Sequence, residues 1–113
     1  MTEYKIHSPW GGDYRIQINV TKYQQNDALA IQLLSWDEEF QFWEPYGMLT
    51  VNLDNSSSLA KDCAFVDTNN IPNAAEFIEE NGLGTFTGRM GFSGFCSYPC
   101  YKFNLDILKG GDE

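Results

Sequence analysis

The sequence predicts an α+β fold, with a mostly antiparallel sheet of about five strands and one main short helix packed on one face. Two observations support this. Several short segments alternate between apolar and polar residues, which is the period of half-buried strands, and residues 72–81 have the spacing of an amphipathic helix. The helix lies between strand segments instead of after each one, which favours antiparallel pairing. At 113 residues, the chain is expected to form a single domain over residues 1–113.

Five segments have the composition of strands. They are residues 14–21, 28–34, 48–53, 63–66 and 101–106. In the first, Ile16 and Ile18 alternate with polar residues, which indicates one buried and one wet face. The second segment, ALAIQLL, is apolar on both faces and is expected to be a central strand. Residues 44–47 (EPYG) have the chemistry of a turn, with Pro second and Gly fourth.

The helix is expected over residues 72–81. Ala74, Phe77 and Ile78 share one of its faces, which should pack on the sheet, since so short a helix is marginal in water alone. Gly82 follows directly and is expected to end the helix in the left-handed conformation.

The polar residues before the helix are expected to be structural. Asn70 is a candidate N-cap, and Pro72 suits a first helical position because its missing N–H has no partner there. Asp67 is expected in an Asx-turn or cap, not as a general base, and Asn69 is expected to bond nearby backbone.

Charge and composition restrict the partners. Sixteen acidic residues face seven basic ones, a net charge of −9, so nucleic acid is an unfavourable partner because its phosphates would be repelled. No apolar run approaches the length of a membrane span, and residues 1–5 have no apolar leader segment. Three cysteines do not make a secreted disulfide framework, so the cytoplasm is expected.

The glycine-rich segment 82–94 is a candidate ligand site. A dinucleotide loop would precede a helix, whereas these glycines follow one, and Arg89 is the sole cation in the segment. An irregular loop pinned by aromatic side chains is the favoured interpretation, and a ligand- or partner-binding loop is the alternative.

The sequence offers few combinations of residues that could bind a metal ion or act as a catalytic nucleophile. Cys96 and Cys100, with Cys63 and His7, could supply four zinc ligands, but the spacing is loose and no second close pair exists. Free thiols are favoured over zinc and over a disulfide between Cys96 and Cys100. His7 is the only histidine, and no nucleophile elbow is present. No catalytic residue, metal or cofactor is therefore expected.

Residues 36–46 (WDEEFQFWEPY) stand apart because five large aromatics lie among four acids. Tryptophan anchors ringed by charge are typical of protein interfaces, and acids attract a basic partner. A structural hairpin whose aromatics cover the sheet is the alternative, with Phe40 and Phe42 on one side and Trp43 on the other. The residues expected to bind a partner are Trp36, Asp37, Glu38, Glu39, Trp43, Glu44 and Tyr46.

The stretches LAIQLL, MLTVNL, AFVDTNN, AEFIEENGLG and TGRMGFSGFCSYPCYKFNL resemble an uncharacterised family of small proteins. It is a domain of unknown function carried by conjugative and other mobile elements of gut bacteria. The resemblance covers residues 14–107, is most specific over residues 64–84 and 87–101, and departs around residues 36–44. It implies a bacterial cytoplasm and an accessory role in a mobile element, and it brings no functional residues.

Two classes of function remain open. The first is a non-catalytic protein-binding module with an unknown, preferably basic, protein partner, docking through a sheet edge or through residues 36–46. One version is an anti-defence inhibitor that mimics the charge of DNA. The second is a small-ligand-binding or enzymatic domain that uses the Asp67–Asn70 junction and the glycine-rich segment 82–94. The poor supply of catalytic side chains favours the first class over an enzyme.

Overall fold

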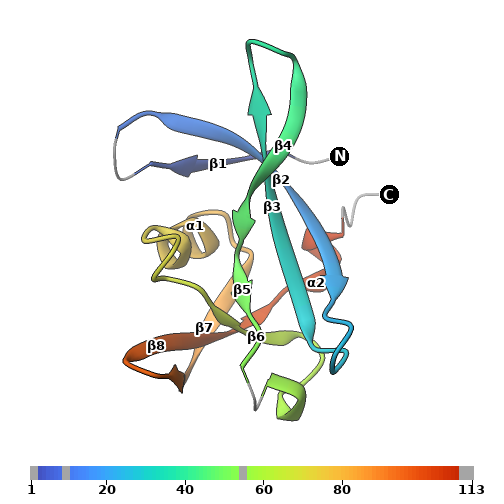
Figure 1. Ribbon diagram of the computed structural model, residues 1–113, viewed down its shortest axis with the longest axis vertical. Helices are drawn as coiled ribbons and strands as arrows, with labels where there is room; N and C mark the ends of the chain where they lie inside the picture. Colours follow the sequence, from blue (N-terminus) through green and yellow to red (C-terminus); the bar gives the residue numbers. More distant parts are fainter. Residues whose placement is uncertain (1–2, 9–10, 54–55, 110–113) are drawn as a thin grey trace.

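The computed structural model describes residues 3–8, 11–53 and 56–109. Strands dominate these residues, and helices are few and short (Figure 1). The strands are β1 (Tyr4–His7), β2 (Asp13–Lys22), β3 (Leu29–Asp37), β4 (Phe42–Met48), β5 (Thr50–Val51), β6 (Cys63–Val66), β7 (Gly84–Ser93) and β8 (Cys96–Phe103). The helices are α1 (Ala74–Glu80), α2 (Leu105–Leu108) and a single 3-10 turn, η1 (Ser56–Ser58).

The strands form two antiparallel sheets of four, in the orders β1-β2-β3-β4 and β5-β6-β8-β7. The α+β class is therefore confirmed, whereas the expectation of one sheet of about five strands is wrong. The reason lies at Leu49, where the predicted strand 48–53 divides. The Leu49 N–H donates to Ile31 of the first sheet, and its carbonyl accepts from Asp67 beside the second. Figure 1 shows the chain passing from β4 into β5 at this point.

The main core lies between the two sheets and α1. Ile31 and Leu33 come from the central strand β3, Val66 and Tyr101 from the second sheet, and Phe77 from α1. This confirms residues 28–34 as a central strand. The expected helix face of Ala74, Phe77 and Ile78 is buried, as predicted.

Helix α1 is shorter than expected, residues 74–80 instead of 72–81. Its N-cap is Asn73, whose side chain makes no capping bond, so the assignment of Asn70 as N-cap is wrong. The C-terminal prediction is confirmed because Gly82 has φ +64°. The Leu83 N–H donates to Ile78 and the Gly82 N–H to Glu79, which closes a Schellman motif on the last turn.

Residues 84–93 form the edge strand β7, where the sequence favoured an irregular loop. Some glycines in this strand are needed because the backbone packs closely against buried side chains, and not only because the chain turns. A Cβ on Gly91 would lie 2.6 Å from Phe65 Cε1 and 2.7 Å from Leu53 Cδ1. Phe65 and Leu53 belong with Cys100 to a second, smaller core on the other face of this sheet. A strand that approaches a buried ring this closely has no room for a side chain.

Two further segments also differ from expectation. Residues 44–47 lie inside β4 instead of forming a turn, because a β-bulge opposite Leu33 and Leu34 takes up Tyr46 as an extra residue. The last strand, β8, ends at Phe103, not at residue 106. The Asn104 side chain accepts the Ile107 N–H at 3.4 Å and starts α2 instead.

Candidate functional site

The segment 36–46 forms the end of the β3–β4 hairpin, which projects at the top of Figure 1. Asp37 holds its turn. The Asp37 carboxylate accepts hydrogen bonds from the N–H of Glu39 at 2.9 Å and of Phe40 at 3.1 Å. The backbone carbonyl of Asp37 accepts the N–H of Gln41 at 2.7 Å. Gln41 completes the turn with φ +55°, in the left-handed region. Asp37 therefore acts first as a turn residue, whatever it also offers to a partner.

Trp36 and Trp43 lie opposite each other across the hairpin, with ring centroids 5.3 Å apart. Both point to the outer face of the first sheet, because alternate residues of β3, such as Leu33 and Ser35, are buried inside. The Arg15 guanidinium lies over both rings, 5.1 Å from the centroid of Trp36 and 5.6 Å from that of Trp43. The two tryptophans are half-buried, so they form a cation–π cluster on the surface, not part of the core.

Acids surround this cluster. Two nitrogens of Arg15 donate to the two carboxylate oxygens of Glu3, each at 2.8 Å. This bidentate bond lowers the pKa of Glu3 and raises that of Arg15. The Trp36 indole Nε1 donates to Glu38 at 2.8 Å. Trp36 and Arg15 are therefore already oriented by hydrogen bonds within the protein.

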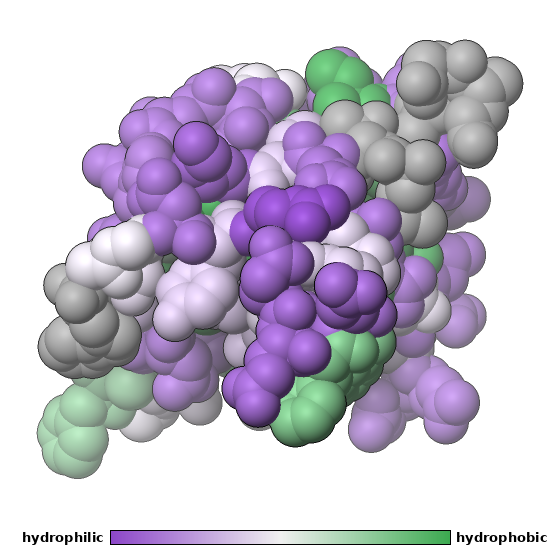
Figure 2. Space-filling view, turned by 90° about the horizontal axis from the view of Figure 1, so that it is seen from above, coloured by the Kyte–Doolittle hydropathy of each residue, from purple (hydrophilic) through white to green (hydrophobic). Residues whose placement is uncertain are grey.

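The most exposed apolar groups of the hairpin are two phenylalanines. Phe40 is 70% exposed at the turn, and Phe42 is 47% exposed beside it. Seen from above this end, the molecule shows mostly hydrophilic surface with separate hydrophobic patches (Figure 2). The sequence predicted the tryptophans as partner-binding residues, but it predicted Phe40 and Phe42 only as rings that could cover the sheet. Their position on either side of a turn residue, F-Q-F, is the signal that could have identified them.

The other residues predicted to bind a partner lie at different positions in the hairpin. Glu39 is exposed at the turn, and Glu44 is half-buried opposite Ser35. Tyr46 packs on Tyr14, with ring centroids 5.5 Å apart, and against the main core. Its partial burial raises the pKa of Tyr46. The structure thus brings Trp36, Trp43 and Glu38 together, and Tyr46 lies farther from the turn, at the bulge in β4.

The polar side chains of the Asp67–Asn70 junction form hydrogen bonds within the protein. The Asp67 carboxylate accepts the Asn70 N–H at 3.2 Å and the Asn70 side-chain amide at 2.7 Å. The Asn69 side chain donates to the Ser97 carbonyl at 3.4 Å. The structural role predicted for Asp67 is confirmed, because this buried carboxylate closes the turn between β6 and α1.

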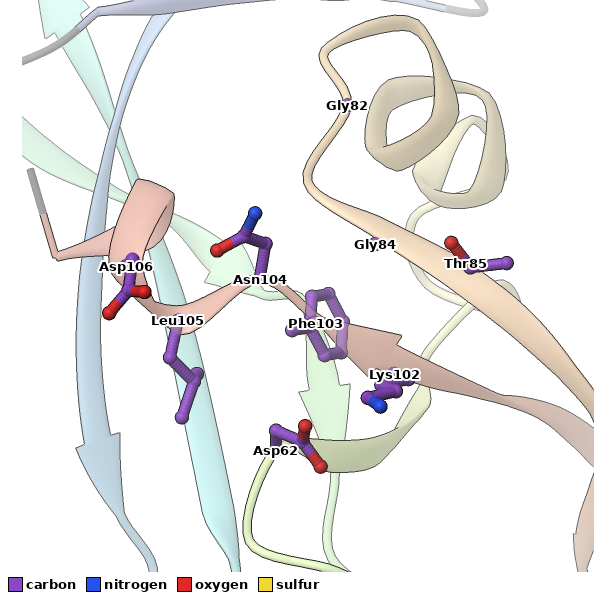
Figure 3. A pocket seen from close by; sticks show the side chains of 9 residues that line it. All are labelled: Asp62, Gly82, Gly84, Thr85, Lys102, Phe103, Asn104, Leu105 and Asp106. Atoms are coloured by element: carbon purple, nitrogen blue, oxygen red, sulfur yellow. The ribbon is translucent and has the colours of Figure 1, made fainter. Parts of the chain in front are cut away.

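A cavity of about 660 Å³ lies where the end of α1, β7, β8 and α2 meet (Figure 3). Its lining consists of Asp62, Gly82, Gly84, Thr85, Lys102, Phe103, Asn104, Leu105 and Asp106. It includes the first two glycines of segment 82–94 but none of residues 67–70, and it has no histidine or cysteine. The two parts of the small-ligand hypothesis are therefore not joined in this cavity.

The four candidate zinc ligands do not gather in one site in the part of the chain that the structure describes. Cys63, Cys96 and Cys100 are free thiols, and burial raises the pKa of Cys63 to about 11. His7 lies instead between Asp13, 2.7 Å from its Nδ1, and Glu80, 3.2 Å from its Nε2. The hydrogen bond with Asp13 raises the pKa of His7. Among the described residues, no three His, Cys, Asp or Glu side chains gather as a metal site.

A family model described as a domain of unknown function, DUF4313, matches residues 17–113. No curated protein and no solved structure matches the chain. In the part of the chain that the structure describes, no helix has the length and apolar character needed to cross a membrane.

Proposed function

Because the chain belongs to the DUF4313 family, a domain of unknown function, we propose a role from its own surface: a non-catalytic protein-binding module that docks on a basic protein through the β3–β4 hairpin end. The observation that carries this proposal is the coincidence of exposed aromatic and acidic groups on one projecting element. Phe40 and Phe42 are exposed there, beside the Trp36–Trp43 pair and the acids Glu38 and Glu39.

The chemistry of this end fits an interface. Aromatic and arginine side chains supply most binding energy at interfaces when water is excluded from them. Arg15 and the two tryptophans are already stacked, so little side-chain entropy would be lost on docking. The surrounding carboxylates and the net charge of −9 would accelerate encounter with a basic surface.

We place this role in the bacterial cytoplasm, as an accessory function of a mobile element. One specific version is an anti-defence inhibitor whose carboxylates occupy the phosphate sites of a DNA-binding enzyme. Such an inhibitor would compete with duplex DNA for its partner. A partner that binds this protein and DNA at the same time would exclude that version while leaving the hairpin interface intact.

The test is affinity capture from a cytoplasmic extract of the host bacterium, followed by quantitative mass spectrometry. Two double variants are compared with the unaltered protein: Phe40→Ser with Phe42→Ser, and Phe86→Ser with Phe92→Ser. The second pair is a matched control on β7, because its phenylalanines are 45% and 72% exposed, close to the 47% and 70% of Phe42 and Phe40.

The proposal predicts that basic proteins are retained by the unaltered protein and by the β7 variant, and lost by the hairpin variant. Retention should weaken at high salt, since screening shortens the range of charge attraction to about 3 Å at 1 M. Equal retention by both variants, or loss with the β7 variant alone, would contradict the hairpin as the interface.

A further inference from the structure

A second cavity lies at the opposite end of the first sheet from the hairpin tip. It has a volume of about 480 Å³ and is formed by the end of β2, the start of β3, α2 and the loop before β6. Its lining consists of Val20, Thr21, Lys22, Asp27, Leu29, Lys61, Leu105 and Lys109. A volume of this size is in the range of small-molecule sites, which run from about 300 to 1,000 Å³.

The charge of this cavity is opposite to that of the protein. Three of the seven basic residues of the chain, Lys22, Lys61 and Lys109, lie on its wall, against one acid, Asp27. They come from three distant parts of the sequence, so the fold brings them together. None of the three forms an ion pair with another described residue. All three are exposed, so an anion bound in the cavity would pair with lysines that otherwise contact water.

The net charge of −9 does not cancel this local excess. At physiological salt, charges separated by more than about 8 Å are largely screened from each other. The acidic cluster of the hairpin lies at the other end of β3 from Leu29, which lines the cavity. Asp62 and Asp106, the sequence neighbours of Lys61 and Leu105, line the other cavity and not this one. The charged groups on this wall are therefore the three lysines and Asp27.

The remaining wall is apolar. Val20 and Leu105 are half-buried, and Leu29 is buried. Leu105 belongs to α2, which packs against β2 and so fixes that side of the cavity. A bare inorganic anion would leave this apolar wall in contact with water. A molecule with an apolar body and an anionic group would cover it and pair with the lysines.

We propose that this cavity, named here the lysine cavity, binds a small amphipathic organic anion. The apolar body lies on Val20, Leu29 and Leu105, and the phosphate or carboxylate group lies among Lys22, Lys61 and Lys109. This site is independent of the hairpin interface, with which it shares no residue.

The test uses 1-naphthyl phosphate as the probe, and its binding is followed by NMR of the isotope-labelled protein and by calorimetry. Two companion compounds separate the contributions: 1-naphthol has the same body without the charge, and inorganic phosphate has the charge without the body. 1-Naphthoate then distinguishes a carboxylate from a phosphate preference. The proposal predicts saturable 1:1 binding of the two naphthyl anions, with chemical-shift changes centred on Val20, Leu29 and Leu105.

Lysine variants test the charge contribution. Replacing Lys22, Lys61 and Lys109 together by Gln should weaken binding about tenfold, since three exposed pairs contribute about twofold each. Lys61→Gln alone should weaken it about twofold. Lys5→Gln is the matched control, because it removes the same charge from β1, outside the cavity, and should leave affinity unchanged.

Three results would overturn the proposal: no saturable binding of either naphthyl anion, equal affinity for 1-naphthol, or unchanged affinity in the triple variant. Shift changes confined to the hairpin or to β7 would equally place the probe elsewhere. Because all three lysines are exposed, their replacement should not affect folding, and a dispersed NMR spectrum of the triple variant checks this.

Discussion

Gly91→Ala is the substitution that most sharply tests the packing of β7. Gly91 is buried, and its missing side chain faces the smaller core. An added Cβ would lie 2.6 and 2.8 Å from two carbons of the Phe65 ring and 2.7 Å from a methyl group of Leu53. Phe65 is fully buried, so its ring cannot swing out to solvent to relieve the contact. Either the ring leaves its preferred rotamer, or β7 moves away from the core.

The expected loss follows from that geometry. Inserting one carbon into a filled core costs about 1–3 kcal/mol. The matched control is Gly47→Ala in β4, where the Cβ would lie 3.4 Å from Ile71 Cδ1, an ordinary contact. There the substitution restricts the unfolded chain and is expected to stabilise by about 0.4–1 kcal/mol. The two variants should therefore differ by about 1.5 kcal/mol or more.

Urea unfolding followed by tryptophan fluorescence measures both variants. The midpoint should fall for Gly91→Ala and hold or rise for Gly47→Ala, with an unchanged dependence of free energy on urea concentration. If Gly91→Ala proved as stable as Gly47→Ala, the close approach of β7 to Phe65 would be refuted. The interpretation of residues 84–93 as a strand against a filled core would be refuted with it.

Other predictions concern α1, the junction and His7. Phe77→Ala should lower the free energy of unfolding by about 3–5 kcal/mol because the ring is 2% exposed; a loss below about 1 kcal/mol in urea unfolding would contradict its core position. Asp67→Ala removes the carboxylate that accepts two hydrogen bonds from Asn70 and should cost about 1–3 kcal/mol by the same assay, whereas an unchanged midpoint would argue against a structural role. Because the folded pKa of His7 is raised, its pairing stabilises the protein below about pH 6.5 and is lost as pH rises through the folded pKa. An NMR titration should show that pKa falling in Asp13→Asn, and no change would rule out their bond.

Local sequence patterns were sufficient to predict the elements whose apolar and polar residues recur at a regular period. The alternation around Ile16 and Ile18 identified β2, and the apolar run from Leu29 identified the central strand β3. Gly82 marked the end of α1 because its left-handed conformation is a property of the residue itself. Each of these features depends on the chemistry of a few neighbouring residues.

The missed features depend on contacts between distant residues. Leu49 divides a continuous apolar run because its backbone bonds with Ile31 on one side and Asp67 on the other. The many glycines around Gly91 are typical of a loop, but Gly91 pairs with Tyr98 in a strand, and Phe65 fills the space that its side chain would need. Neither constraint is visible in the residues that surround Leu49 or Gly91 in the sequence.

In the candidate site, too, local features were predictable from the sequence, whereas features that depend on distant contacts were not. The sequence located the aromatic and acidic segment but could not tell which rings remain exposed. Trp36 and Trp43 are half-covered by Arg15, which lies two strands away in the sheet from Trp43. Phe40 has no such cover. Part of the cover over this hairpin thus comes from β2, a strand that composition alone does not connect to the segment.

The most direct test of the hairpin interface is photo-crosslinking in living host cells. A benzoylphenylalanine is placed at Phe40 in one variant and at Phe92 in another, two positions with 70% and 72% exposure. The proposal predicts a specific adduct with a basic protein from position 40 and none from position 92. An adduct from position 92 alone, or no adduct from either position, would contradict the assignment of the β3–β4 hairpin end as the binding surface.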